Sequence, residues 1–137
     1  MKFKTSGPLV VFCRMTGPTG RVREVQAVLE PSFDRCIVLK GDAVQMGYPS
    51  VTYRQEDWQD TSPTEVSMVI SIKGVELGTY VTLKEVSVGS LKAENVEAVV
   101  TKAEFPGMIP ASAFLGRSFL KHFKLEVDAK SNTFSLT

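Results

Sequence analysis

Few side chains in this sequence could do chemistry, and they do not form a pattern typical of a metal site. The chain has one histidine, His122, and two cysteines, Cys13 and Cys36, which lie far apart in apolar runs. This spacing matches no set of metal ligands, so we predict no metal and no cofactor. We interpret the two cysteines as small buried hydrophobic residues rather than as a disulfide, and His122 as a surface residue.

Carboxylates are the remaining candidates for acid–base catalysis. Glu30 follows the apolar run 27–29, and is either a catalytic carboxylate or a polar residue that closes a strand. Asp34, four residues further on, is better interpreted as a turn residue, and Asp128 as an exposed partner of a lysine. Trp58 lies in a polar segment, where it either anchors a loop or forms an exposed contact.

Length and charge limit the classes of function. The 137 residues correspond to one domain, 1–137, and the formal net charge is only +1, from 16 basic and 15 acidic residues. So small a net charge provides no long-range attraction to nucleic acid or to an anionic membrane. No apolar run approaches the roughly 20 residues of a membrane helix, and the start lacks a signal-peptide core. We therefore expect a cytoplasmic domain with no nucleic-acid and no membrane partner.

Short β-type runs separated by Gly, Pro, Asn and Ser dominate the chain. Strands are predicted over residues 9–15, 22–29, 36–39, 66–72, 80–88 and 92–101, with a hairpin over 125–136. Short helices are predicted at 41–47, with Ala43, Val44 and Met46 inward and Gly47 at the end, and at 117–123. Such a succession favours a mostly β, closed or sandwiched architecture with one or two short helices.

Three segments, in this order, resemble the retropepsin-like aspartic proteases. Residues 27–47 resemble the strand, catalytic turn, strand and short helix of that family, and residues 71–100 resemble its flap and following strands. The run Leu115-Gly116-Arg117 resembles its second apolar-glycine motif. The resemblance implies a retropepsin-like closed β-barrel that forms half of an acid protease and assembles as a homodimer. It also implies a flap hairpin over 66–88, with Gly74 and Gly78 beside its tip.

The sequence departs from the family at the catalytic motif. Where the family has Asp-Thr-Gly, this chain reads Glu30-Pro31-Ser32. In the family each subunit contributes one aspartate, and the two share a proton and activate a water. Glu30 is longer by one carbon–carbon bond, about 1.5 Å. Pro31 lacks both the hydroxyl that braces the two loops and a backbone N–H, and Ser32 replaces a conformationally free glycine.

Two functional hypotheses follow from the altered motif. The first is a degenerate retropepsin-like domain that dimerises and binds a peptide or protein partner without cleaving it. The alternative is an active homodimeric endopeptidase in which a pair of Glu30 carboxylates activates water. A third possibility is that the change is engineered or peculiar to this chain. The missing hydroxyl and glycine favour the first hypothesis. The extra length of Glu30 also opposes catalysis, because misplacement of a catalytic group by about 1 Å can reduce the rate about 100-fold.

Overall fold

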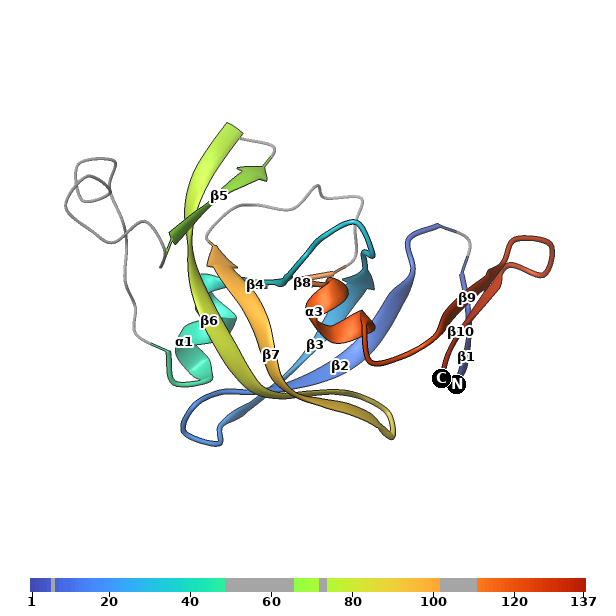
Figure 1. Cartoon of the computed structure of the whole chain (residues 1–137), viewed down its shortest axis with the longest axis horizontal. Coiled ribbons are helices and arrows are strands. Elements are labelled where there is room, and N and C mark those ends of the chain that lie inside the picture. Colours follow the sequence, from blue (N-terminus) through green and yellow to red (C-terminus); the bar gives the residue numbers. More distant parts are fainter. Residues whose placement is uncertain (6, 49–65, 72–73, 102–110) are drawn as a thin grey trace.

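The computed structural model describes residues 1–5, 7–48, 66–71, 74–101 and 111–137, and this part of the chain is mostly β (Figure 1). The two helices described are short, α1 (Lys40–Gln45) and α3 (Arg117–Leu120), and no described helix is long and apolar enough to cross a membrane. The strands are β1 (Lys2–Lys4), β2 (Val10–Thr16), β3 (Val22–Leu29), β4 (Cys36–Leu39), β5 (Val66–Ser71), β6 (Gly74–Val88), β7 (Leu91–Thr101), β8 (Ala113–Leu115), β9 (Leu125–Asp128) and β10 (Thr133–Leu136).

The larger sheet closes into a barrel, as the sequence predicted. Its strand order is β2-β3-β8-β4-β7-β6-β5, and an additional pairing of β2 with β6 makes a ring of six strands, with β5 added outside the ring on β6. The closing register places Arg14 opposite Ser87 and Thr16 opposite Glu85. Closure leaves no open edge within the ring, which is the usual solution for a small all-β core.

The barrel interior follows the alternation of apolar residues along the strands. On β2, Val11, Cys13 and Met15 are buried, whereas Phe12 and Arg14 between them are exposed. This is the period of two that a strand with one buried face requires. Both cysteines are free and buried in the same core, which confirms their interpretation as small hydrophobic residues.

Helix α1 spans Lys40–Gln45 rather than the predicted 41–47, and its buried face also differs from the prediction. Ala43 and Met46 are buried as expected, but Val44 is 39% exposed and Asp42 is buried in its place. Residues three apart share a helix face, so Ala43 and Met46 point inward together while Val44 is rotated away by about 100°. The burial of Asp42 is offset by an ion pair with Arg23, with 2.7 Å between Oδ1 and Nε.

A second, three-stranded sheet is built from the two ends of the chain (Figure 1). Its order is β1-β10-β9, all antiparallel, so the predicted hairpin over 125–136 is confirmed and gains a strand that the sequence did not predict. Phe3 of β1 stacks on the buried ring of Phe134, with 4.9 Å between the ring centroids. These contacts attach the N-terminus to the C-terminal hairpin within one chain.

Candidate functional site

The site forms where β3 and β8 end. These two strands are parallel, with Ala27 opposite Ala113 and Leu29 opposite Leu115, so both finish on the same side of the barrel. β8 lies between β3 and β4, the two strands that residues 30–35 connect. That connection must therefore cross the end of β8, and the backbone N–H of Glu30 donates to the carbonyl of Leu115 at 2.9 Å.

The residues that follow β8 hold the 30–35 loop in place. The N–H of Arg117 donates to the carbonyl of Phe33 at 2.7 Å, and the Arg117 guanidinium forms an ion pair with the Asp34 carboxylate. Gly116 is required by the close approach, because a Cβ there would lie 2.7 Å from the carbonyl oxygen of Phe33 and closer still to that of Arg35. The structure thus brings the Leu115-Gly116-Arg117 run against the Glu30 loop.

The Glu30 carboxylate is bonded within its own loop. Its Oε1 accepts one hydrogen bond from the Ser32 hydroxyl at 2.5 Å and a second from the Ser32 backbone N–H at 3.2 Å. The Phe33 N–H donates to the Glu30 carbonyl at 3.1 Å and closes a tight turn around Pro31. Two donors occupy the two lone pairs of Oε1, so only Oε2 is left to face a ligand or water.

An aromatic residue that the sequence reasoning missed lies beside this turn. Phe33 is 36% exposed, and its ring meets Phe114 edge to face with 5.3 Å between the centroids. An apolar side chain between the polar residues Ser32 and Asp34 is the sequence signal that could have identified it. The exposed turn therefore presents proline and aromatic surface next to a carboxylate.

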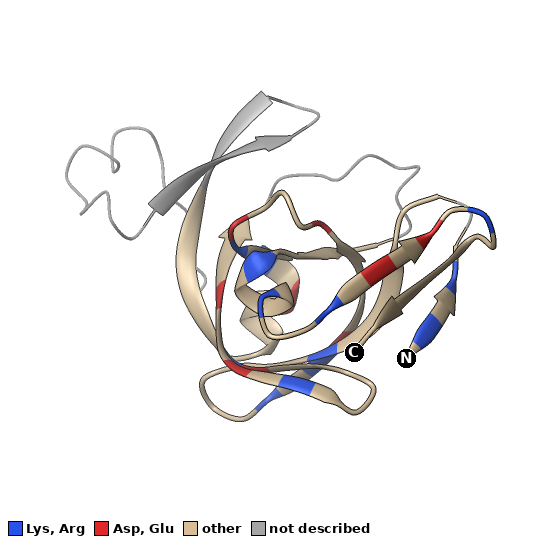
Figure 2. Cartoon of the chain, turned by 45° about the vertical axis from the view of Figure 1, so that its right-hand side comes forward, with Lys and Arg blue, Asp and Glu red and all other residues tan. Residues whose placement is uncertain are grey.

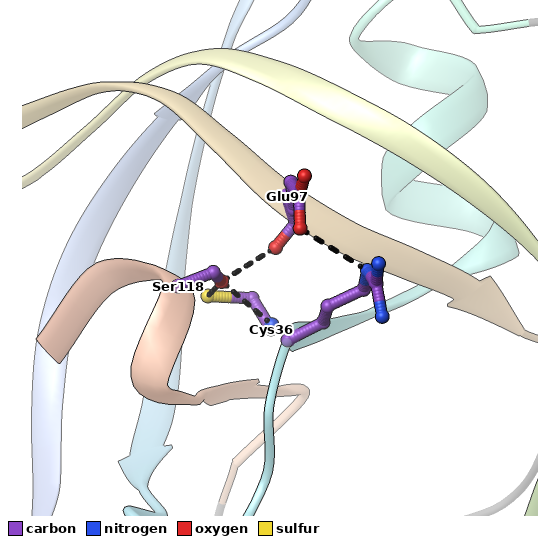
Figure 3. A network of polar contacts seen from close by, with 4 residues as sticks. Cys36, Glu97 and Ser118 are labelled. Atoms are coloured by element: carbon purple, nitrogen blue, oxygen red, sulfur yellow. Dashed lines mark hydrogen bonds and ion pairs between the residues drawn. The ribbon is translucent and has the colours of Figure 1, made fainter. Parts of the chain in front are cut away.

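A polar network lies beside the loop (Figure 3); it is buried at Ser118 and Cys36 and exposed at the Glu97 side chain. Ser118 is buried; its hydroxyl accepts the N–H of Cys36 at 3.2 Å and donates to the carbonyl of Glu97 at 2.6 Å. The Glu97 carboxylate pairs with Arg35 at 3.3 Å, and the Arg35 guanidinium lies 4.5 Å from the centre of the Tyr80 ring. These contacts join α3, β4 and β7. Nothing in the sequence distinguished Ser118 beyond its place after the Gly116-Arg117 pair.

The two glycines of the predicted flap occupy different positions. Gly74 begins β6 and lies opposite Ser71, which ends β5; residues 72–73 between them lie outside the described part. Gly78 lies four residues inside β6, opposite Ser67, and is buried. Figure 1 shows β5 and the start of β6 extending beyond the barrel.

The other candidate residues lie away from the loop or have structural contacts. His122 is exposed, with its ring edge-on to Phe123. Asp128 caps a turn, because its Oδ1 accepts the N–H groups of Lys130 at 3.0 Å and Ser131 at 3.3 Å. Trp58 lies outside the described residues. Within the described ranges, no group of three or more His, Cys, Asp or Glu side chains is placed to hold a metal ion.

Comparison with known proteins rests on structure alone. No family model and no curated protein matches the sequence. A solved structure that does match is that of a retropepsin-like aspartic protease from Rickettsia conorii, at 14% identity and a TM-score of 0.61. The match covers 99% of this chain and 88% of that chain. The chain therefore has the fold of a retropepsin-like aspartic protease.

Proposed function

We propose that this domain dimerises and binds a peptide or protein partner without cleaving it. The observation that carries the proposal is the closed turn at residues 30–32, in which Ser32 supplies both hydrogen bonds to one oxygen of Glu30. A general base must lie within hydrogen-bond reach of the water it activates. Glu30 occupies the family's catalytic position, and one oxygen of its carboxylate already accepts hydrogen bonds from its own loop.

The same turn has no group with which to brace a second copy. Retropepsin-like proteases join their two catalytic loops through the hydroxyl of the Thr or Ser after the aspartate. Pro31 occupies that position and has neither a hydroxyl nor a backbone N–H. The Ser32 hydroxyl is engaged with Glu30 inside its own loop. Two copies facing each other would thus bring together two carboxylates that are each hydrogen-bonded within their own loop, rather than a pair of carboxyl groups that share a proton.

The surface around the turn favours a protein or peptide partner. Pro31 is exposed and Phe33 is 36% exposed, so binding would remove apolar and aromatic area from water. Figure 2 shows basic and acidic residues interspersed over the described part, as expected for a chain of net charge +1. This distribution does not favour nucleic acid. A cytoplasmic location is part of the proposal and rests on the sequence alone.

The proposal is tested by rebuilding the family motif. We expect the unmodified chain and Glu30→Asp to leave a diverse peptide mixture uncut between pH 4 and pH 7. The triple change Glu30→Asp, Pro31→Thr and Ser32→Gly removes the Ser32 bonds and restores the bridging hydroxyl, and should begin to cleave. The same triple variant carrying Asn in place of Asp at position 30 is the matched control and should stay inactive.

The competing function is an active homodimeric endopeptidase in which the Glu30 carboxylates of the two subunits activate a water. Cleavage by the unmodified chain that Glu30→Gln abolishes, and that a transition-state analogue of aspartic proteases blocks, would establish it. Under the preferred function, the same analogue binds the dimer without turnover. Isothermal titration with the unmodified chain and with Glu30→Gln measures that binding directly.

A further inference from the structure

The first half of β3 extends past its neighbour β8. Ring closure gives each strand of the barrel two neighbouring strands, but β8 has only three residues and pairs with β3 from Ala27 onwards. Just before that pairing, the N–H of Ser112 donates to the carbonyl of Gln26 at 3.0 Å. Among the described residues, no strand pairs with residues 22–25 on this side of β3. They form a short open edge, and such an edge is a template for another strand.

The hydrogen-bond pattern shows which groups of this edge point outward. The N–H of Leu29 donates to the carbonyl of Leu9 at 2.8 Å, so this residue of β3 bonds towards β2. Bonded pairs alternate along an antiparallel ladder, and the register of β2 with β3 is continuous. Val22 and Glu24 lie an odd number of residues from Leu29, so their N–H and C=O groups point to the open side. The carbonyl of Gln26 has the same phase and accepts its bond on that side.

A groove lies beside this edge. Its volume is about 540 Å³, which is within the range of protein sites that hold ligands. The groove is lined by residues 23–26 of β3, by Phe12 of β2, by Asp42 of α1, and by Ala111 and Ser112. The outward groups of β3 therefore face space that another segment can occupy.

The side chains around the groove favour an uncharged and apolar occupant. Arg23 is paired with Asp42, with 2.7 Å between Nε and Oδ1, and Glu24 is paired with Arg14 at 3.3 Å. These ion pairs leave the groove without a net charge that would select an acidic or a basic ligand. Phe12 is 74% exposed, more than any other large apolar side chain of the described residues. An exposed aromatic ring gains most from burial against apolar surface.

We propose that this edge binds an extended, uncharged segment of a partner protein, which adds to β3 as an antiparallel strand. Main-chain hydrogen bonds would supply affinity and the Phe12 ring would select an apolar side chain, as in other cases of strand addition. The inference goes beyond the contact proposed at the Glu30 turn and does not require a dimer. Gln26 lies four residues before Glu30, which is about 13 Å along the strand.

The outward groups set the register of the added strand. A residue of the segment opposite Glu24 exchanges both hydrogen bonds with it, and the next bonded pair falls at Val22. Ser112 limits the segment at the other end, because it already holds the Gln26 carbonyl. Phe12 lies opposite Gln26, so the added strand is two strand spacings from β2, about 9–10 Å. A large apolar side chain on the outer face of the segment can reach the Phe12 ring across this distance.

A second copy of this chain fits the edge less well. Pairing two such edges around Glu24 places the two Glu24 carboxylates directly opposite each other, and like charges in that position are destabilising. Pairing them around Arg23 places two guanidinium groups opposite each other instead. The charges of the edge therefore favour a different polypeptide over a copy of this chain.

Short linear peptides from a display library, selected on the unmodified chain, test the edge. Glu24→Pro deletes an N–H that β2 does not use, so the barrel should fold, whereas the affinity for the selected peptides should fall at least about tenfold. Glu24→Thr loses the same ion pair but keeps the N–H, and should stay within about threefold of the unmodified chain. Phe12→Thr should weaken binding about tenfold. Val44→Gln removes an exposed apolar side chain from α1 and should change the affinity less than about twofold.

Amide hydrogen exchange tests the same edge in the unmodified chain, so it does not depend on the folding of a variant. Without peptide, the N–H of Glu24 should exchange much faster than that of Val25, which bonds towards β2. A saturating selected peptide should slow exchange at Glu24 at least about tenfold and leave Val25 nearly unchanged.

Three results would overturn this inference. The first is that the selected peptides bind Glu24→Pro as tightly as the unmodified chain and leave exchange at Glu24 unchanged. The second is that their binding is lost in Phe33→Ser but kept in Glu24→Pro, which assigns the contact to the Glu30 turn and leaves the proposed function standing. The third is that the library yields no peptide with a Kd below about 100 μM. Binding that Glu24→Pro abolishes and Phe33→Ser leaves intact supports the inference, whatever the outcome of the cleavage tests.

Discussion

Gly116→Ala isolates the contact that holds the candidate site together. Gly116 has φ −93° and ψ −167°, values that alanine adopts freely, so the substitution adds only a methyl group. That methyl would lie 2.7 Å from the Phe33 carbonyl oxygen and 2.8 Å from the carbonyl carbon of Arg35. Both are backbone atoms, so no side-chain rotation relieves the clash, and the 30–35 loop has to move away from β8.

The expected loss of stability is about 3 kcal/mol. Overpacking alone costs about 1–3 kcal/mol. Displacing the loop also weakens the bonds from the N–H of Arg117 to Phe33 and of Ser118 to Asp34, which contribute about 1 kcal/mol each. For a domain of this size, the change corresponds to a fall in Tm of about 10 °C. Urea unfolding followed by far-UV circular dichroism at fixed protein concentration measures the difference.

Gly41→Ala provides the matched control for this measurement. Gly41 lies in α1, and a Cβ there meets no atom within 4 Å. Alanine is favoured over glycine in a helix by up to about 1 kcal/mol, so this variant should be as stable as the unmodified chain or more so. If the free energy of unfolding of Gly116→Ala stays within about 0.5 kcal/mol of that of the unmodified chain, the close approach of Gly116 to the 30–35 loop is contradicted.

Two further predictions concern the core. Ser118→Ala leaves the buried N–H of Cys36 without its acceptor and should lower the free energy of unfolding by about 1–3 kcal/mol. Ser131 is exposed, so the control change Ser131→Ala should alter the free energy of unfolding by less than about 0.5 kcal/mol. Burial raises the pKa of Cys13 from 9.0 to about 12, and that of Tyr48 from 10.0 to about 12. Both groups are neutral when protonated and have a higher pKa in the folded chain, so their contribution to stability is complete below about pH 9 and declines towards pH 12. Tyr48→Phe should reduce the decline above pH 10, and stability that stays constant from pH 9 to 12 would contradict this explanation.

The sequence predicted best those elements whose apolar residues alternate or run continuously. The strands over 22–29 and 36–39 were predicted with the bounds of β3 and β4, because apolar residues and flanking turn residues mark them. β8 has only three residues and was recognised only as part of a resemblance. β1 has two lysines around one phenylalanine, and only its pairing with β10 makes it a strand.

The candidate site was predictable in its parts but not in its contacts. Resemblance singled out Glu30 and Gly116, yet the pairing of Asp34 with Arg117 joins residues 83 apart, and no local pattern contains it. The bonds from Ser32 to Glu30 are local, but they depend on the turn adopted around Pro31. Contacts that depend on which strands lie side by side, as β8 does between β3 and β4, therefore cannot be predicted from a local pattern alone.

The most direct test of the central claim is whether the unmodified chain cuts peptide bonds. A proteome-derived peptide library incubated with the chain between pH 4 and pH 7 can be read by mass spectrometry, with Glu30→Gln as the matched control. Because one Glu30 oxygen is held by Ser32 and Pro31 has no bridging hydroxyl, we expect the same peptides from both proteins and no new termini. New termini that appear with the unmodified chain and vanish with Glu30→Gln would contradict the proposal and assign catalysis to Glu30.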